Sequence, residues 1–169
     1  MRLGVISDSH GYLDLVNEVL GELGPLDFII HAGDYYQDGA KLGEMYRVDF
    51  VSVVGNCDRG LKGPVERQID FAGKKILVTH GHVHGVKSSC QKLLRYGRKL
   101  GIDILVFGHT HKPFFHQEDE IILFNPGSPY QPRGNSKPSI GLLEVNGNEV
   151  KARILEINRQ TRVVGVKFW

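Results

Sequence analysis

Five short runs of apolar residues recur along the first two thirds of the chain, and they constrain its fold more than any other feature. They occupy residues 2–7, 27–33, 49–55, 74–80 and 103–108, and each is almost continuously apolar. Strands that are covered on both faces have this pattern, whereas strands with one wet face alternate apolar and polar residues. Helical patterns separate some of these runs. The alternation of strand and helix predicts an α/β fold.

Two segments have apolar residues at helical spacing. The first, residues 12–23, repeats leucine and valine every three or four positions and is followed by a Gly-Pro pair that ends a helix. The second runs from Ser88, a candidate N-cap, to Gly101, which precedes another apolar run. Each therefore predicts a helix between two strands.

The C-terminal third changes character, because strand-like pieces follow one another without helices. These pieces are residues 121–125, 140–145 and 149–157, and Asn146 with Gly147 between the last two predicts a hairpin. We expect this part of the chain to form a second, more antiparallel sheet packed in the same domain.

Composition limits the classes of protein that the chain can belong to. A length of 169 residues, 41% hydrophobic and 24% charged, suits one globular domain covering residues 1–169. A net charge of +2 does not indicate a nucleic-acid surface. The apolar runs are far below the roughly 20 residues of a membrane helix, so no membrane partner is expected.

The location and assembly of the chain follow only as expectations. The N-terminus enters a strand-like run directly, without the apolar segment of a signal peptide, so a cytoplasmic location is the default. Cys57 and Cys90 have no C-x-x-C spacing, which fits a reducing compartment. The apolar tail, residues 163–169, could close either a core or a homo-oligomer interface.

Side chains that can bind a metal stand at the end of each of the five apolar runs or directly after it. In chain order they are Asp8 and His10, then Asp34, Asn56, His80, and finally His109 and His111. In open α/β sheets, ligands bind beyond the carboxyl ends of the strands, so neighbouring parallel strands would bring these groups to one edge. Taken singly, each has a structural interpretation: Asp8 could cap the following helix, and Gly-Asp and Gly-Asn are ordinary turn dipeptides. Their recurrence after every run favours a ligand site.

The order D-x-H, G-D, G-N, H-G-H and G-H-x-H resembles that of the calcineurin-like metallophosphoesterases. Cys57 in "GNCD" and the segment "FNPGS" at residues 124–128 are similar to the small bacterial and archaeal phosphodiesterase branch of that superfamily. The resemblance implies an α/β fold in a single domain: a four-layer α-β-β-α sandwich of two mixed sheets. It also implies two divalent metal ions per chain.

Transferred to this sequence, the resemblance assigns a ligand set to each ion, with Asp34 bridging the two. The first set is Asp8, His10, Asp34 and His111, and the second is Asp34, Asn56, His80 and His109. Nitrogen and oxygen ligands without thiolate suit manganese, which we expect first, or nickel, iron or zinc.

The activity implied by the resemblance is hydrolysis of a phosphodiester, with a hydroxide that bridges the ions as nucleophile. Asp34, Asn56 and His80 would then take part in catalysis as well as in metal binding. The two ions, their carboxylates and the hydroxide would leave a net charge of about +1 at the centre, which attracts a small phosphodiester monoanion.

Cys57 departs from the superfamily pattern. Larger members have histidine at this position, where it is thought to help protonate the leaving oxygen, and a thiol with an ordinary pKa of about 8.5 is a weaker acid than imidazolium. We therefore expect a preference for good leaving groups. A nucleophilic Cys57 is the alternative. Asp58 is a candidate hydrogen-bond partner for a metal-binding imidazole.

The remaining candidates are open. Arg133 could clamp a substrate phosphate or be an ordinary surface arginine. His82 could line the substrate pocket or support a metal ligand. His84 is expected in a loop, and His31 and His116 are expected to be non-catalytic.

The second hypothesis for function is a protein-binding scaffold, because the retromer subunit that resembles this branch uses the same fold with an impaired metal site. All the expected ligand positions are intact here, which favours catalysis. Metal content and hydrolysis of a nitrophenyl phosphodiester would discriminate between the two. A nucleotide-binding module has little support, because the P-loop and G-x-G-x-x-G motifs are missing from the sequence.

Overall fold

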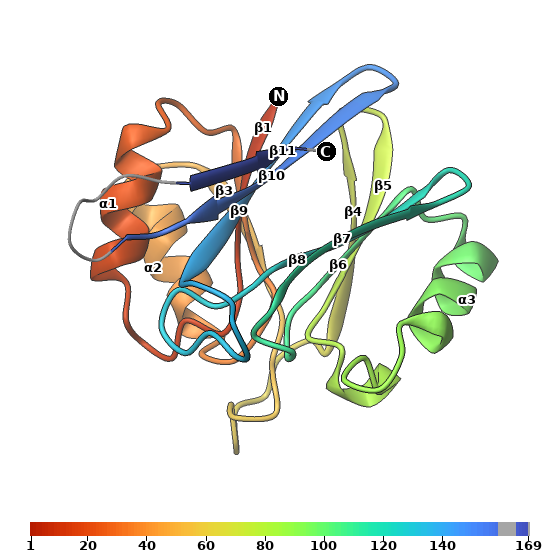
Figure 1. Cartoon of the computed structure of the whole chain (residues 1–169), viewed down its shortest axis with the longest axis horizontal. Coiled ribbons are helices and arrows are strands. Elements are labelled where there is room, and N and C mark those ends of the chain that lie inside the picture. The colour runs from red at the N-terminus through yellow and green to blue at the C-terminus, as the bar shows by residue number, and fades with distance from the viewer. Residues whose placement is uncertain (159–164, 169) are drawn as a thin grey trace.

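Two facing β-sheets with helices on their outer sides build the protein, in the order helix, sheet, sheet, helix (Figure 1). The computed structural model describes residues 1–158 and 165–168, and side chains through Asn158. Both sheets contain parallel and antiparallel pairs. The predicted α/β sandwich of two mixed sheets is therefore confirmed. The side chains of the apolar tail, residues 163–169, lie outside the described part.

The first sheet has the strand order β11-β10-β9-β1-β2-β3. Its strands are β1 (Arg2–Ile6), β2 (Phe28–His31), β3 (Asp49–Ser52), β9 (Ser139–Asn146), β10 (Glu149–Glu156) and β11 (Gly165–Phe168). β1, β2 and β3 are parallel, and β9 pairs antiparallel with the other side of β1. β9 and β10 form the predicted hairpin, with Gly147 at φ 59° in its turn.

The second sheet has the order β4-β5-β6-β8-β7. Its strands are β4 (Glu66–Phe71), β5 (Lys74–Thr79), β6 (Ile104–Phe107), β7 (Pro113–Glu118) and β8 (Ile121–Pro126). β5, β6 and β8 are parallel, and the edge strands β4 and β7 are antiparallel.

The expectation of a separate antiparallel sheet in the C-terminal third is wrong. β8 joins the second sheet beside β6, whereas β9 and β10 extend the first sheet beside β1. The physical reason is burial: β8 is buried along its whole length and β9 along most of it, so each needs a central place between two other strands.

Three helices cover the outer faces of the sheets. α1 (Asp14–Glu22) and α2 (Gln37–Tyr46) lie on the first sheet, and α3 (Gln91–Leu100) lies on the second (Figure 1). A single 3-10 turn, η1 (His82–His84), follows β5. α3 ends at Gly101 as predicted, but it begins after Cys90 instead of Ser88. The hydroxyl of Ser89 accepts the amide of Gln91, the first residue of the helix. No helix in the described ranges is long and apolar enough to cross a bilayer.

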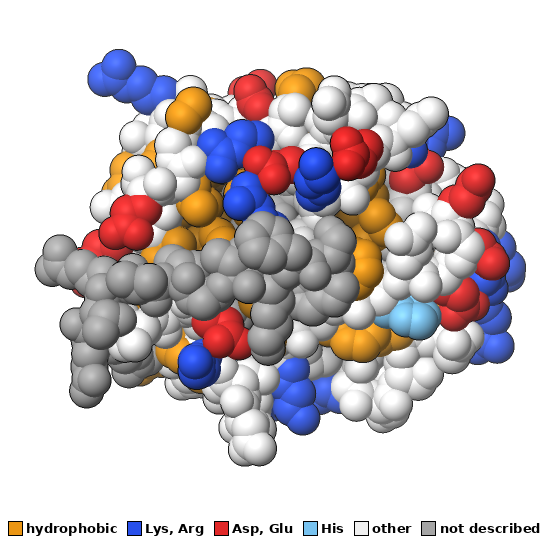
Figure 2. All heavy atoms as spheres, turned by 45° about the horizontal axis from the view of Figure 1, so that its top comes forward, with side chains coloured by type: hydrophobic (Ala, Val, Ile, Leu, Met, Phe, Trp, Pro, Cys, Tyr) orange, Lys and Arg blue, Asp and Glu red, His pale blue; other side chains and the backbone are white. Residues whose placement is uncertain are grey.

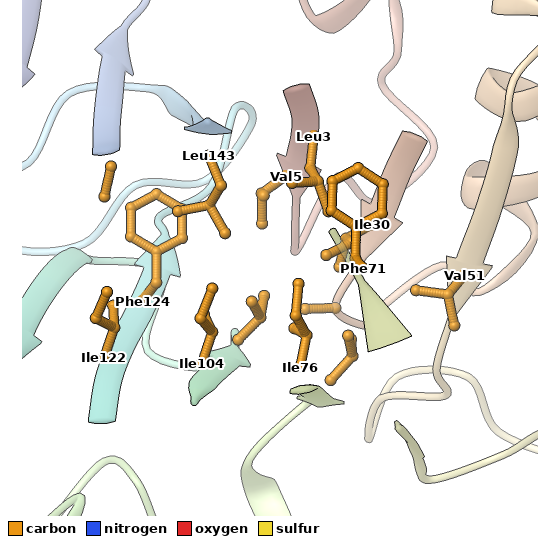
Figure 3. Close-up of a cluster of buried hydrophobic side chains, with 14 of the residues drawn as sticks. Leu3, Val5, Ile30, Val51, Phe71, Ile76, Ile104, Ile122, Phe124 and Leu143 are labelled. Atoms are coloured by element: carbon orange, nitrogen blue, oxygen red, sulfur yellow. The ribbon is translucent and has the colours of Figure 1, made fainter. Parts of the chain in front are cut away.

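The main core lies between the two sheets (Figure 3). Leu3, Val5 and Ile30 of the first sheet face Ile76, Ile104 and Phe124 of the second, and most of this cluster is fully buried. Burying one such side chain stabilises the fold by roughly 1.5–3 kcal/mol. Packing of this kind holds the sheets face to face, which brings the carboxyl ends of β1, β2 and β3 near those of β5 and β6.

The surface in Figure 2 carries acidic and basic side chains interspersed with each other and with apolar ones. This mixture agrees with the small net charge of +2. On the face shown, the charges do not gather into the single basic stripe that binds a nucleic-acid backbone.

Candidate metal centre

Loops from both sheets meet at one end of the inter-sheet core and bring carboxylates and imidazoles together. Asp8 follows β1 and Asp34 follows β2, both in the first sheet. His80 follows β5 and the segment 108–111 follows β6, both in the second. The sequence suggested a single edge shared by five neighbouring strands. The strands instead belong to two sheets, and the groups converge because the sheets face each other.

Asp8 is the most connected residue of this centre. Its buried carboxylate accepts hydrogen bonds from the Ser7 hydroxyl at 2.6 Å and the His109 amide at 3.0 Å through Oδ2. Oδ1 lies 3.2 Å from His80 Nε2 and 3.1 Å from His111 Nε2. The helix-capping interpretation does not hold, because α1 begins after Leu13 without a side-chain cap.

One set of potential ligand atoms is close enough to hold an ion. Asp8, His10, Asp34 and His111 each offer an atom, and all of these atoms lie within 4.8 Å of one another. They are the residues that the sequence assigns to the first ion.

The imidazoles of this cluster have the nitrogen chemistry that a metal requires. Nε2 of His10 is buried without a hydrogen-bond partner among the described residues. His111 Nδ1 lies 2.7 Å from the carbonyl of Gln131, to which it donates, so in the neutral ring Nε2 keeps its lone pair on the side of Asp8. Two carboxylates and two such imidazoles fit a divalent transition ion.

Asp34 is held where it can reach both halves of the centre. Its Oδ1 accepts the amide of Cys57 at 2.8 Å, and its Oδ2 lies 3.6 Å from His80 Nε2. A side chain at Gly55 would overlap the Asp34 carboxylate, and one at Gly33 would come within 2.8 Å of the His80 ring. Glycine at these two positions therefore lets the loops close on the centre.

The second predicted set is gathered more loosely. The rings of His80 and His109 pack with centroids 4.9 Å apart, and His80 Nε2 is near Asp34. Asn56 is exposed, and its amide donates to Cys57 Sγ at 3.5 Å. His80 therefore contacts both Asp34 and His109, whereas Asn56 lies at the exposed edge of the centre.

Charge coupling and burial set the protonation of the centre. Burial by itself would raise the pKa of Asp8, but the hydrogen bonds that the rings of His111 and His80 donate to it in their protonated forms outweigh burial and lower that pKa well below its ordinary value. Burial, with the neighbouring His80 and Lys87, lowers the pKa of His109 to about 4. Asp8 is therefore ionised and His109 neutral near pH 7, the forms in which both can bind a metal.

The backbone of the centre is unusual as well. Asp8, His10, Asp34, His109 and His111 have φ between 51° and 67°, in the left-handed region that non-glycine residues seldom adopt. Such conformations cost free energy and persist where the surrounding structure fixes them. Here all five lie in the loops that carry the candidate ligands.

Cys57 and Asp58 occupy the loop beside Asp34. Cys57 is exposed as a residue, but partial burial of its sulfur and the nearby Asp34 carboxylate raise the pKa of the thiol to about 11, so the group is a thiol near neutral pH. Asp58 accepts the amides of Tyr35 and Tyr36 at 2.9 Å each and that of Gly55 at 2.8 Å. Its described partners are thus backbone amides, which corrects the expectation of an imidazole partner.

The two candidate substrate contacts lie on different sides of the centre. His82 Nδ1 is 3.0 Å from His80 Nδ1, so one ring must donate to the other. If His80 donates, its Nε2 keeps the lone pair that faces Asp8 and Asp34. The side chain of Arg133 is exposed and borders a cavity, while its amide donates to the carbonyl of His111.

The other histidines lie away from the ligand atoms. His84 is buried in η1 near Glu66, and His116 is exposed on β7. His31 lies behind the centre: the Ser9 hydroxyl donates to Asp38 at 2.7 Å, and His31 Nε2 lies 2.8 Å from the same hydroxyl. Sequence reasoning missed this network, which joins the loop between Asp8 and His10 to α2.

Asn125 and Ser128 were also missed as structural supports of the centre. The Asn125 amide donates to the carbonyl of Gly108 at 2.8 Å and to the hydroxyl of Thr110 at 3.1 Å. The Ser128 hydroxyl donates to the carbonyl of Asp8 at 2.7 Å. A polar residue inside the apolar run 121–126 was the available signal, since buried amides are kept where they have partners.

Two facing mixed sheets with carboxylates and imidazoles at the junction of their loops define an α/β protein with a candidate metal site of nitrogen and oxygen ligands. The model of the calcineurin-like phosphoesterase superfamily domain matches residues 1–148. The chain belongs to this superfamily. Its fold and candidate site agree with the metal-dependent phosphoester chemistry for which the superfamily is named.

Relatives cover nearly the whole chain. It is 34% identical over 162 residues to a probable metallophosphoesterase of Methanothermobacter thermautotrophicus, with 92% of each chain covered. It is 29% identical to the phosphodiesterase YfcE of Escherichia coli, with 98% of this chain and 97% of YfcE covered.

Solved structures show the same fold. A predicted phosphoesterase of Streptococcus pneumoniae superposes with a TM-score of 0.80 at 30% identity, covering 99% of this chain and 96% of that one. A vacuolar protein sorting 29 protein of Entamoeba histolytica, complexed with zinc, has a TM-score of 0.83 at 24% identity and covers 100% and 98%.

Proposed function

We propose that this protein hydrolyses small phosphodiesters with the help of two divalent metal ions. Manganese is the metal that we expect first at both sites. The observation that carries the proposal is the cluster of Asp8, His10, Asp34 and His111, with the Nε2 atom of His10 buried and unpartnered among the described residues. The name of the relative YfcE, a phosphodiesterase, supports a diester substrate.

Each ion would have its own ligands, with Asp34 shared. Asp8, His10 and His111 would complete the first set, and Asn56, His80 and His109 the second. When bound, the ions would supply activation of water and neutralisation of phosphoryl charge.

The side chains of this protein would supply position and charge. Asp8 and Asp34, both buried, hold two negative charges where cations must bind. The neutral imidazole of His109 avoids repelling a cation, because burial lowers its pKa to about 4. Cys57, beside Asp34, would face the departing oxygen as a thiol, a weak proton donor.

Scaffolding is the alternative, since the fold is shared with vacuolar protein sorting 29 structures. At 24% identity this likeness extends to the fold alone. The gathering of ligand atoms from Asp8, His10, Asp34 and His111 within 4.8 Å of one another favours catalysis, because a pure scaffold has no need for such a cluster.

The test is hydrolysis of bis(nitrophenyl) phosphate by manganese-loaded protein. Asp8→Asn keeps the size of the side chain but removes the charge, and we expect kcat/KM to fall at least about 100-fold, as for loss of a metal-site partner. Lys99→Gln, on the exposed end of α3, serves as the matched control. A wild-type rate in Asp8→Asn, or no hydrolysis by metal-loaded wild type, would overturn the proposal.

A further inference from the structure

A cavity of about 690 Å³ opens beside the metal centre, outside the residues assigned to either ion. Thr110, which stands between His109 and His111, forms part of its wall, and Arg133, whose amide bonds the carbonyl of His111, forms another part. The volume is within the range of roughly 300–1,000 Å³ that small-molecule sites occupy. A ligand in this cavity would therefore border the loop that carries two of the metal-binding imidazoles.

The cavity is positively charged. Lys87, Lys112 and Arg133 line it, and its lining contains neither aspartate nor glutamate. Through residue 158, these three cations have no carboxylate within ion-pair distance. Unpaired cations around a hollow favour an anionic ligand.

One wall of the cavity is aromatic. Phe107 is buried at its base, and its ring packs against Phe114 with centroids 6.1 Å apart. Phe114 and His116 lie on the same face of the edge strand β7, with ring centroids 6.2 Å apart, and Phe114 is 39% exposed. An exposed aromatic face beside cations suits a flat ring that carries an anionic group.

We propose that this cavity selects the substrate by binding a nucleoside-sized aromatic group that carries a second phosphate, while the reacting phosphodiester lies at the metal centre. The inference rests on the proposed function for the placement of the reacting group. Lys87 and Lys112 would pair with the second phosphate, and Phe114 would contact the ring.

Direct binding tests the cavity without relying on hydrolysis. Calorimetric titration of manganese-loaded wild type should show that thymidine bisphosphate binds about tenfold more tightly than thymidine monophosphate, because the additional phosphate makes charge-assisted contacts. The double variant Lys87→Gln, Lys112→Gln should reduce this preference to less than about threefold, whereas Lys99→Gln should retain it. Phe114→Ser should weaken the binding of both nucleotides and leave the ratio of their affinities unchanged.

Equal affinities in wild type, or a preference that survives in the double variant, would overturn the inference. Unfolding curves verify that each variant folds, and the exposed positions of both lysines make this the expected result. The kinetic companion compares the nitrophenyl ester of thymidine monophosphate with and without the additional phosphate, so that the leaving group is constant. A binding preference without hydrolysis of either ester would contradict the proposed function and leave the cavity assignment standing. Hydrolysis of both esters without any preference for the additional phosphate would support the proposed function and contradict the cavity assignment.

Discussion

Asp8 joins the two sheets at the level of single residues. Its carboxylate contacts His80 and His111 from the second sheet, while its own backbone amide donates to the carbonyl of Gly33 in the first. The residue is fully buried, and burial of an ionised carboxylate is tolerated only when hydrogen bonds or a cation compensate it. Asp8 is therefore the residue at which the fold and the metal centre depend most directly on each other.

Cys57 is the residue at which mechanism is most open to test. Because burial and Asp34 raise the pKa of this thiol to about 11, it is a poor proton donor and carries little thiolate near neutral pH. Cys57→His should therefore raise kcat/KM for esters with poor leaving groups, by up to roughly 100-fold, and should help nitrophenyl esters less. Cys57→Ala should lower kcat/KM only slightly.

The measurement is kcat/KM for wild type and both variants over a series of leaving groups at fixed metal concentration. A large loss in Cys57→Ala with both metal sites filled would show that the thiol participates in the reaction. The interpretation that the protein lacks a general acid at position 57 would then have to be abandoned.

His31 couples stability to pH. Burial lowers its pKa to about 4, against the opposing attraction of Asp38, whereas in the unfolded chain its pKa is near 6.5. The unfolded state therefore binds a proton that the folded state refuses between these values. The free energy of unfolding should fall as pH drops from about 6.5 to 4, by on the order of 3 kcal/mol from this residue.

Urea unfolding of metal-free protein across this pH range, for wild type and His31→Gln, isolates the effect, since the other titrating groups are common to both. The difference between the two curves should change with pH in the stated direction. Parallel curves for the two proteins would contradict a neutral, buried His31.

At the scale of elements, the segment 108–111 is the part of the centre that depends most on a neighbour. Asn125 in β8 donates to the Gly108 carbonyl and accepts the amide of Gly127 at 2.9 Å. Asn125→Ala would leave these buried groups unpaired, so we expect a loss of about 2–3 kcal/mol in the free energy of unfolding. Because the segment carries His109 and His111, metal affinity should also fall roughly 10- to 100-fold.

Urea unfolding in chelator and metal titration measure the two effects separately. Asn148→Ala, at the exposed turn between β9 and β10, provides the matched control and should change neither quantity. If Asn125→Ala bound metal with wild-type affinity, a role for Asn125 in positioning this segment would be refuted.

The sequence predicted the buried strands well and the peripheral elements poorly. β1, β2, β3, β5 and β6 correspond to the five apolar runs. β1, β2 and β6 are buried along almost their whole length, which leaves an unambiguous pattern, whereas the edge strand β3 begins with two exposed residues. The edge strands β4 and β7 escaped notice because they are polar along one face, and β7 begins with proline.

α2 was missed for a different reason. Its contact face contains Gly39 and Gly43, residues that ordinarily indicate a turn. A side chain at Gly43 would meet the ring of Phe50 at 2.5 Å, and one at Gly39 would meet Ser52 at 2.9 Å. The glycines permit close packing of α2 on β3, a requirement of the tertiary structure that a single sequence does not reveal.

The sequence predicted which residues form the candidate site, but it did not predict the hydrogen-bond partners that hold them in place. The order of carboxylates and imidazoles pointed to the set that the structure gathers around Asp8. The partners that hold this set, such as the Gln131 carbonyl for His111 and the Ser128 hydroxyl for Asp8, come from sequence-distant segments. Local pattern carries no information about which distant backbone group a side chain will reach.

At the scale of the whole molecule, the candidate metal centre lies where the loops of the two sheets meet. The groups that both sheets contribute must be held together against the repulsion of buried carboxylates. Ions would supply that attraction, and their binding should stabilise the folded state. We propose above all that the assembled protein binds two divalent ions, with Asp34 shared between them.

Elemental analysis of manganese-loaded, desalted protein tests this claim most directly. We predict two ions per chain in wild type, and about one in His111→Ala, which lacks a ligand of the first set, or in His109→Ala, which lacks one of the second. Lys99→Gln should retain both. No more than one ion per chain in metal-replete wild type would contradict the dinuclear centre.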